Sequence, residues 1–157
     1  MTKILFVCHG NICRSPMAEY LMRELIAQEG LAWAYDVASA AVSQEELGNP
    51  VYPPAVRMLE RHGISCRGHH ARQMTQEDYD AYDLIIGMDR SNLAGMTRIA
   101  GGDPQGKFSL LLSWAGRGGS VDDPWYSGDF DAAWRDIDEG CRALLQKTRP
   151  DRAHTGQ

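Results

Sequence analysis

The stretch Lys3-Ile-Leu-Phe-Val-Cys-His-Gly-Asn-Ile-Cys-Arg-Ser-Pro16 decides the fold of this chain. Residues 3–8 form a short apolar run without alternation, which predicts a strand buried on both faces of a parallel sheet. Beyond a loop, apolar residues recur at helical spacing as far as Gly30, which predicts an amphipathic helix. Because Ser15 precedes Pro16, we expect Ser15 to cap this helix and Pro16 to take its first position.

The rest of the chain continues this alternation of strands and helices. Further strands are predicted over 35–42, 84–88 and 108–114, and further helices from Pro53, after Thr75, over 91–100 and over 130–148. This order predicts a single α/β domain with three layers, α/β/α, and a four-stranded parallel sheet with right-handed crossovers. We assign residues 1–150 to the domain and predict a loose C-terminal tail over 151–157. The ligand site is expected at the carboxyl ends of the strands.

Length, charge and cysteine content narrow the class of protein. The chain has 157 residues, which suits one domain. Its 16 basic and 21 acidic residues give a net charge of −5, so no basic footprint for nucleic acid or an anionic membrane is evident. The apolar run Ile4 to Cys8 is far shorter than the ~20 residues that span a bilayer. With no secretion signal evident, the four cysteines are expected to be thiols, and the protein to be cytoplasmic.

The loop after the first predicted strand is suited to binding a phosphate dianion. Its backbone N–H groups have no helix or strand partners, so they can converge on an anion together with the helix N-terminus. Gly10 lets the backbone curl closely, and Asn11 tolerates left-handed dihedral angles. The residues expected to bind the phosphorylated substrate here are His9, Gly10, Asn11, Ile12, Cys13 and Ser15.

Cys8 and Arg14 stand where they would act on that dianion. A thiolate at Cys8 is stabilised by the same donors, which makes it a nucleophile at neutral pH. The Arg14 guanidinium can grip two phosphoryl oxygens at once. Either residue alone fits a structural role, but their joint placement predicts catalysis. Cys13 has two open interpretations: a packed thiol, or a disulfide partner that protects Cys8 from over-oxidation.

These motifs resemble the low-molecular-weight protein tyrosine phosphatases. The resemblance runs from the first motif through His69-His-Ala-Arg-Gln73 and Met88-Asp89 to Asp123-Pro-Trp-Tyr126 and the final helix. It implies hydrolysis of phosphotyrosine on proteins through a phosphocysteine at Cys8. Resemblance to the bacterial members also implies a partner that is a bacterial tyrosine kinase or its phosphorylated target.

The resemblance further implies roles for individual residues. Arg14 holds the phosphoryl group, Ser15 stabilises the Cys8 thiolate, and Asn11 with His69 braces the loop. A departing tyrosyl oxygen must be protonated, so a carboxylic acid is needed opposite the loop.

Asp123 is the candidate general acid, and it would then activate water as a base. Local reasoning does not separate it from Asp122, and the resemblance selects the residue directly before Pro124. Trp125 and Tyr126 are expected to flank the substrate's phenyl ring. The chain departs from many members at two rim positions, with Glu45 near a usual Trp and Trp125 at a usual Tyr.

Other functions are less consistent with the sequence. Ile12 favours phosphotyrosine, because the branch resembling protein arginine phosphatase has Thr there. An arsenate reductase of the same fold needs two further cysteines around the third strand, and residues 80–90 contain none. A non-catalytic phosphopeptide-binding module, or a thiol redox sensor using Cys8 and Cys13, is the alternative from another class. Cys66 with His69 and His70 lacks a fourth ligand, so we expect no metal and no cofactor. We expect a monomer.

Overall fold

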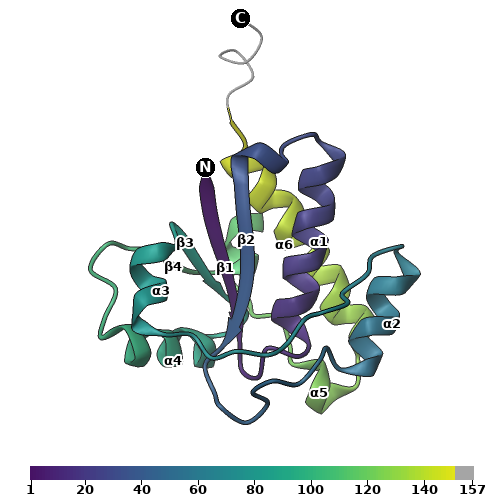
Figure 1. Ribbon diagram of the computed structural model, residues 1–157, viewed down its shortest axis with the longest axis horizontal. Coiled ribbons are helices and arrows are strands. Elements are labelled where there is room, and N and C mark those ends of the chain that lie inside the picture. The colour runs from purple at the N-terminus through teal and green to yellow at the C-terminus, as the bar shows by residue number, and fades with distance from the viewer. Residues whose placement is uncertain (151–157) are drawn as a thin grey trace, which may run out of the picture.

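The computed structural model describes residues 1–150 and has a four-stranded, all-parallel sheet flanked by helices (Figure 1). This confirms the predicted α/β class. The tail predicted over 151–157 lies outside the described residues.

The strands are β1 (Thr2–Cys8), β2 (Tyr35–Ala41), β3 (Leu84–Gly87) and β4 (Phe108–Leu110), in the order β2-β1-β3-β4. The α-helices are α1 (Arg14–Gln28), α2 (Pro53–Arg61), α3 (Gln76–Ala81), α4 (Arg90–Ala100), α5 (Pro124–Ser127) and α6 (Phe130–Thr148). Two 3₁₀ turns, η1 (Ala32–Ala34) and η2 (Leu111–Ala115), complete the elements.

Strand β1 lies in the middle of the sheet and separates two hydrophobic cores. Ile4 and Phe6 face the core formed with α1, α2 and α6, whereas Leu5 and Val7 face the core formed with α3 and α4. All four side chains are fully buried, as an apolar strand without alternation predicts. Figure 1 shows α1, α2 and α6 on one side of the sheet and α3 and α4 on the other.

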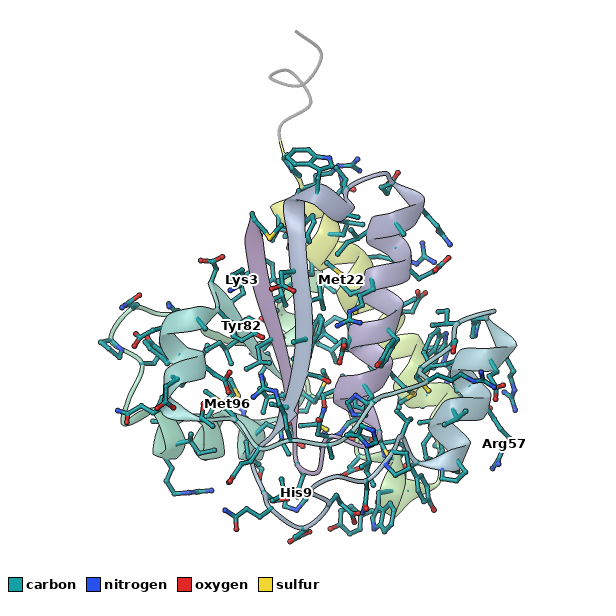
Figure 2. The ribbon with its side chains drawn as sticks, in the orientation of Figure 1. Lys3, His9, Met22, Arg57, Tyr82 and Met96 are labelled. Atoms are coloured by element: carbon teal, nitrogen blue, oxygen red, sulfur yellow. The ribbon has the colours of Figure 1, made fainter. Side chains whose placement is uncertain are left out.

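The carboxyl end of β1 is the point where the connections diverge. From β1 the chain crosses to β2 on one side, and from β2 it crosses back to β3 on the other. Ligands of open α/β sheets bind at such a switch point. Figure 2 shows His9 just beyond this end of β1, at the opposite end of the strand from Lys3. In the described part of the chain, no helix has the length and apolarity to cross a bilayer.

The start of α1 differs from the prediction. The helix begins at Arg14, Cys13 occupies the N-cap position, and no side chain caps the first turn. Ser15 is the second residue of the helix and Pro16 the third. Pro16 is tolerated there because the N–H groups of a first turn have no partner within the helix. The Ser15 hydroxyl is used instead by Cys8, as described below.

The fourth strand is also shorter than predicted. Strand β4 ends at Leu110, and the rest of the apolar run 108–114 forms the 3₁₀ turn η2. The turn buries two consecutive residues, Leu111 and Leu112, whereas a strand would have sent them to opposite faces. Leu111 packs against α6 at Gly140, where an added Cβ would lie 2.5 Å from the Leu111 Cγ. The short helix α5 was not predicted.

Candidate active site

Residues 9–13 form the loop that connects β1 to α1. Two of its carbonyl groups accept hydrogen bonds from residues in other parts of the chain. The Asn11 carbonyl accepts a hydrogen bond from His69 Nε2 at 2.9 Å, and the Ile12 carbonyl accepts one from the Tyr52 N–H at 2.9 Å. Asn11 is the only non-glycine residue with positive φ, 61°, in the described part of the chain. Among residues 1–150, the N–H groups of residues 9–14 have no backbone or side-chain acceptor. The loop therefore presents donors that a phosphate dianion could satisfy.

The Cys8 sulfur lies at the end of β1, against the first turn of α1. Ser15 Oγ is 3.0 Å from Cys8 Sγ, and the Ser15 N–H donates to the same sulfur at 3.4 Å. Because Ser15 Oγ already accepts from Asn11 Nδ2 at 2.8 Å, its own proton is free for the sulfur. The Cys8 sulfur therefore faces two hydrogen-bond donors from Ser15.

A buried network of polar side chains holds Asn11 and Ser15 in place beside Cys8. Asn11 Nδ2 also donates to Ser39 Oγ at 2.9 Å, and Ser39 donates to Glu19. Glu19 is paired with Arg23 Nη2 at 2.6 Å. Asn11, Ser15, Ser39 and Glu19 are all at most 5% exposed, so the chain is shielded from water. Sequence reasoning missed Ser39 and Glu19, although Glu19 follows Ser15 by one helical turn and so shares its face.

Arg14 is 2% exposed and is held by three acceptors. Nη1 donates to Asp89 Oδ2 at 2.7 Å and to the Val121 carbonyl at 2.9 Å, and Nη2 reaches Asp123 Oδ2 at 3.3 Å. Burial alone would lower the pKa of Arg14, but the Cys8 sulfur and the Asp89 and Asp123 carboxylates outweigh burial and raise it. Arg14 is thus a permanent cation beside Cys8. Asp89 was not predicted as its partner, although it lies just beyond β3 at the same sheet edge.

Asp123 faces the loop from α5. It is the N-cap residue of that helix, and its Oδ1 accepts from the Trp125 N–H at 3.1 Å. Its side chain is 21% exposed. Asp122 is exposed and does not line the cleft at Cys8. The structure therefore separates two adjacent carboxylates that local sequence reasoning left equivalent.

The cleft brings together most of the residues predicted for the site. It is lined by Cys8, His9, Gly10, Ile12, Cys13, Arg14, Glu45, Glu46, Asp123, Trp125 and Tyr126. Three predicted residues, Asn11, Ser15 and His69, do not line it, and they support the loop from behind. At the mouth, His9 Nε2 lies 3.0 Å from Glu45 Oε2. Sequence reasoning missed Glu46.

Aromatic side chains form one wall of the mouth. Trp125 is 48% exposed and Tyr126 is 81% exposed. The Trp125 ring lies 4.7 Å from the ring of Tyr52, a residue that sequence reasoning also missed. Such exposed aromatic rings beside a polar cleft can pack on a planar ligand.

Cys13 lines the same cleft as a free thiol. It is buried and packs with Ile12 and Ala71. Burial, followed by the nearby Cys8 and Asp123, raises the pKa of the Cys13 thiol. A raised pKa disfavours the thiolate form of Cys13 at neutral pH. Within residues 1–150, no cluster of three or more His, Cys, Asp or Glu side chains is arranged to hold a metal ion.

Comparisons with known proteins agree on one family. The model of the family described as low molecular weight phosphotyrosine protein phosphatase matches residues 3–154. The low molecular weight protein-tyrosine-phosphatase YfkJ of Bacillus subtilis is 37% identical over 154 residues, covering 97% of this chain and 99% of the relative. Its crystal structure superposes with a TM-score of 0.91, covering 96% of this chain and 98% of that chain.

Two further solved structures are informative. Vibrio vulnificus Wzb in complex with benzylphosphonate has a TM-score of 0.81 at 30% identity, covering 93% of this chain and 98% of that chain. A Drosophila arginine phosphatase has a TM-score of 0.86 at 31% identity, covering 96% and 99%. Together with the loop, the buried arginine and the facing carboxylate, these matches lead to one conclusion. The chain belongs to the low molecular weight phosphotyrosine protein phosphatases, a family of phosphoric monoester hydrolases.

Proposed function

We propose that this enzyme hydrolyses phosphotyrosine on proteins through a phosphocysteine at Cys8, with Asp123 as general acid and base. The observation that carries the proposal is the environment of the Cys8 sulfur. The sulfur accepts hydrogen bonds from the Ser15 hydroxyl and the Ser15 N–H. It also lies beside the loop N–H groups, which have no acceptor among residues 1–150, and beside the buried Arg14 cation. Together these groups would stabilise a thiolate and hold a phosphoryl group against it.

In the first step the Cys8 thiolate attacks phosphorus. The S–P bond forms while the bond from phosphorus to the tyrosyl oxygen breaks, and Asp123 gives its proton to that oxygen. Arg14 Nη2, which contacts Asp123 in the structure, would turn to the phosphoryl oxygens, and this would release Asp123 for the leaving group. The loop N–H groups would stabilise the negative charge on the equatorial oxygens.

In the second step water hydrolyses the phosphocysteine. Asp123, now a carboxylate, takes a proton from water as the new O–P bond forms and the S–P bond breaks. Inorganic phosphate leaves, and the Cys8 thiolate and the protonated Asp123 are restored. The two steps together consume only the substrate and one water molecule.

The cleft mouth supports a phenyl phosphate rather than an alkyl phosphate. Trp125 and Tyr126 both line the cleft that contains Cys8, and benzylphosphonate, bound by the Vibrio protein, carries a ring at a similar distance from phosphorus. Ile12 supports phosphotyrosine over phosphoarginine. We further propose a protein substrate phosphorylated by a bacterial tyrosine kinase, and a monomeric enzyme.

The test is turnover by the purified protein in the presence of EDTA at mildly acidic pH. p-Nitrophenyl phosphate should be hydrolysed, Cys8→Ser should be inactive, and Cys66→Ser, a matched thiol substitution outside the cleft, should retain activity. Full activity of Cys8→Ser would contradict the mechanism. Phosphotyrosine, phosphoserine and phosphoarginine peptides, compared side by side, decide the substrate. Binding of phosphotyrosine without turnover would favour a non-catalytic module.

A further inference from the structure

Tyr52 connects the phosphate loop, residues 9–13, to the aromatic wall of the catalytic cleft. Its N–H donates to the Ile12 carbonyl of the loop at 2.9 Å, and its side chain packs on the small buried cluster that includes Ile12 and Cys13. The same ring lies 4.7 Å from the ring of Trp125, with 54° between the two ring planes. One side chain therefore contacts both the loop that is suited to a phosphate and the wall that is suited to a phenyl ring.

The backbone of Tyr52 is fixed on both sides of its side chain. Besides the bond to Ile12, the Tyr52 carbonyl accepts from the Ala55 N–H at 2.9 Å and from the Val56 N–H at 3.0 Å, in the first turn of α2. Because Pro53 follows, helical geometry is disfavoured at Tyr52, and its ψ of 134° makes it the N-cap residue of that helix. The point from which the ring extends is therefore set by hydrogen bonds that a change of side chain leaves in place.

Phe130, the first residue of α6, also contacts the Tyr52 ring. The two rings stack with their centroids 6.1 Å apart and 27° between their planes. All of the side-chain contacts of Tyr52 are thus apolar or aromatic, and its hydroxyl takes part in none of the hydrogen bonds found among residues 1–150. The ring is therefore the part of this side chain that matters for packing, and the hydroxyl is dispensable.

The position of the Trp125 side chain depends on this ring. Trp125 is 48% exposed and belongs to α5, a helix of only four residues. In the described part of the chain, Tyr52 carries the only aromatic ring that contacts the Trp125 ring. A half-exposed side chain keeps much of its rotamer freedom unless a neighbour restricts it. The Tyr52 ring is the neighbour that restricts the indole at the mouth of the cleft.

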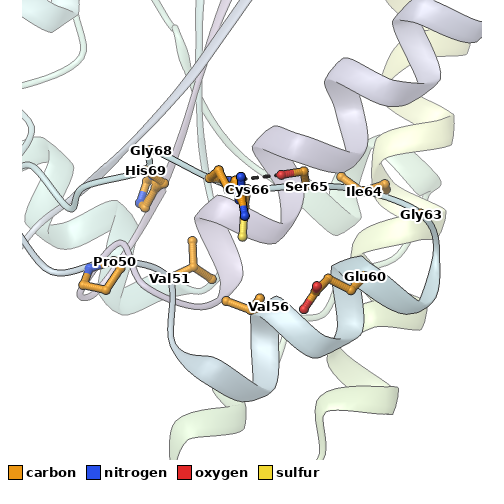
Figure 3. A pocket seen from close by; sticks show the side chains of 11 residues that line it. Pro50, Val51, Val56, Glu60, Gly63, Ile64, Ser65, Cys66, Gly68 and His69 are labelled. Carbon is orange, nitrogen blue, oxygen red and sulfur yellow. Dashed lines mark hydrogen bonds between the residues drawn. The ribbon is translucent and has the colours of Figure 1, made fainter.

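Tyr52 itself does not line the catalytic cleft, whose lining includes Ile12 and Trp125. Figure 3 shows Val51 and Val56, which come shortly before and after Tyr52 in the chain, at the edge of a neighbouring pocket of about 520 Å³. Tyr52 does not line that pocket either. It can therefore affect a ligand in the catalytic cleft only through the residues that it contacts.

We propose that Tyr52 is a positioning residue that fixes the Trp125 ring at the mouth of the cleft and thereby raises the affinity of the cleft for aryl phosphates over alkyl phosphates. The inference rests on the proposed function, whose substrate class it explains. An indole that is already ordered loses less conformational entropy when a phenyl ring packs on it. A phosphoryl group without a ring gains nothing from this order, because the loop N–H groups and Arg14 would bind it.

The test compares the dissociation constants of benzylphosphonate and methylphosphonate, which differ only in the phenyl ring, by calorimetry with the full chain. Tyr52→Leu keeps apolar volume next to Ile12 and Cys13 but removes the aromatic ring. It should weaken the binding of benzylphosphonate about two- to tenfold, as expected for the loss of an aromatic pair, and that of methylphosphonate less than about twofold. Tyr52→Phe should bind both ligands like the wild type. Tyr82→Leu, which changes a partly buried tyrosine in the other hydrophobic core, is the matched control and should also bind like the wild type.

A double-mutant cycle tests whether Tyr52 acts through Trp125. In a Trp125→Ala background, Tyr52→Leu should cause no further loss of benzylphosphonate affinity. The same loss in both backgrounds would overturn the proposal. Equal weakening of the two phosphonates would also overturn it, because that result would show a structural effect on the loop, and so would equal losses in Tyr52→Phe and Tyr52→Leu. Tyr52→Met, a second variant with an apolar side chain and no ring, takes the place of Tyr52→Leu if the latter does not fold.

The titrations involve no turnover, so they are separable from the test of the proposed function. Normal hydrolysis of phosphotyrosine peptides by the wild type, together with unchanged benzylphosphonate affinity in Tyr52→Leu, would refute the role of Tyr52 alone. The expected changes in affinity without any hydrolysis by the wild type would refute the proposed function alone.

Discussion

Arg14 Nη1 donates to Asp89 Oδ2 at 2.7 Å, which joins the first turn of α1 to the N-cap residue of α4. The bond links segments 75 residues apart and lies beside Cys8, the proposed nucleophile. Asp89 Oδ1 also accepts from the Asn92 N–H at 2.8 Å, so one carboxylate positions both the Arg14 guanidinium and a helix.

Asp89→Asn keeps an N-cap side chain but removes the charge that holds Arg14. We expect the free energy of unfolding to fall by about 1.5–3 kcal/mol, the worth of a hydrogen bond to a charged group. We expect kcat/KM to fall about ten- to a hundredfold, because a misplacement of ~1 Å costs up to ~10²-fold. Urea unfolding and initial rates measure the two effects. Asp138→Asn, which disrupts an ion pair with Arg142 on the surface, is the control, and equal behaviour of the two variants would refute the role of Asp89.

Asp123→Asn retains an acceptor for the Trp125 N–H but has no proton to transfer. Turnover of phosphotyrosine should fall by about 10²–10⁴-fold, the usual contribution of general acid–base catalysis. Turnover of p-nitrophenyl phosphate should fall less, because nitrophenolate leaves without protonation. Asp122→Asn should resemble the wild type. The opposite pattern would assign the acid to Asp122.

Ser15→Ala removes the hydroxyl that lies 3.0 Å from Cys8 Sγ and accepts from Asn11 at 2.8 Å. Alkylation of Cys8 by iodoacetamide should then require higher pH than in the wild type, and kcat should fall about tenfold or more. Mass spectrometry of the alkylated peptide across a pH series measures the first effect. Ser113→Ala, which removes an exposed hydroxyl from η2, is the control. An unchanged alkylation profile for Ser15→Ala would show that the hydroxyl does not stabilise the thiolate.

Asp103 stabilises the turn that precedes β4. Its carboxylate accepts from Tyr79 Oη at 2.6 Å and from the Lys107 N–H at 2.8 Å. Burial would raise the pKa of Asp103, but these hydrogen bonds outweigh burial and lower it. A lowered pKa in the folded state stabilises the protein above the unfolded pKa of about 3.9, and this stabilisation is lost as pH falls through the folded value.

Asp103→Asn should therefore destabilise the protein at pH 7, and its difference from the wild type should shrink as pH drops below about 4. Urea unfolding of both proteins at neutral and acidic pH measures this. Asp80→Asn, an exposed change in the same region, should show no such trend. A difference that stays constant with pH would contradict the role given to Asp103.

The sequence predicted the parts of the fold that depend on local patterns. The unbroken apolar run of β1 predicts burial on both faces, and Thr75, with Asp78 three residues later, predicts the N-cap of α3. The apolar run 108–114 does not distinguish a strand from a tight turn, because either would bury its side chains. The packing of Leu111 against α6 favours the turn over a strand. The sequence pattern carries no information about that contact.

In the candidate site, too, some residues are predictable from the local sequence and others are not. Cys8, Arg14 and the loop share one continuous segment, so their spacing is visible in the sequence. Asp89 and Ser39 meet that segment only in the folded protein, and their sequence separations from it give no local signal. The choice of Asp123 over Asp122 depends on the N-cap of α5, a helix too short to give a periodic pattern.

The dependence of Arg14 on Val121 has a consequence for synthesis on the ribosome. Cys8, the proposed nucleophile, and its loop are among the first residues to be made, yet the Val121 carbonyl that accepts from the guanidinium arrives 107 residues after Arg14. For most of translation a growing chain therefore contains Cys8 and Arg14 without this partner of the guanidinium. The proposed site is therefore complete only after residues past 120 have been made and have folded against a loop that was made at the start.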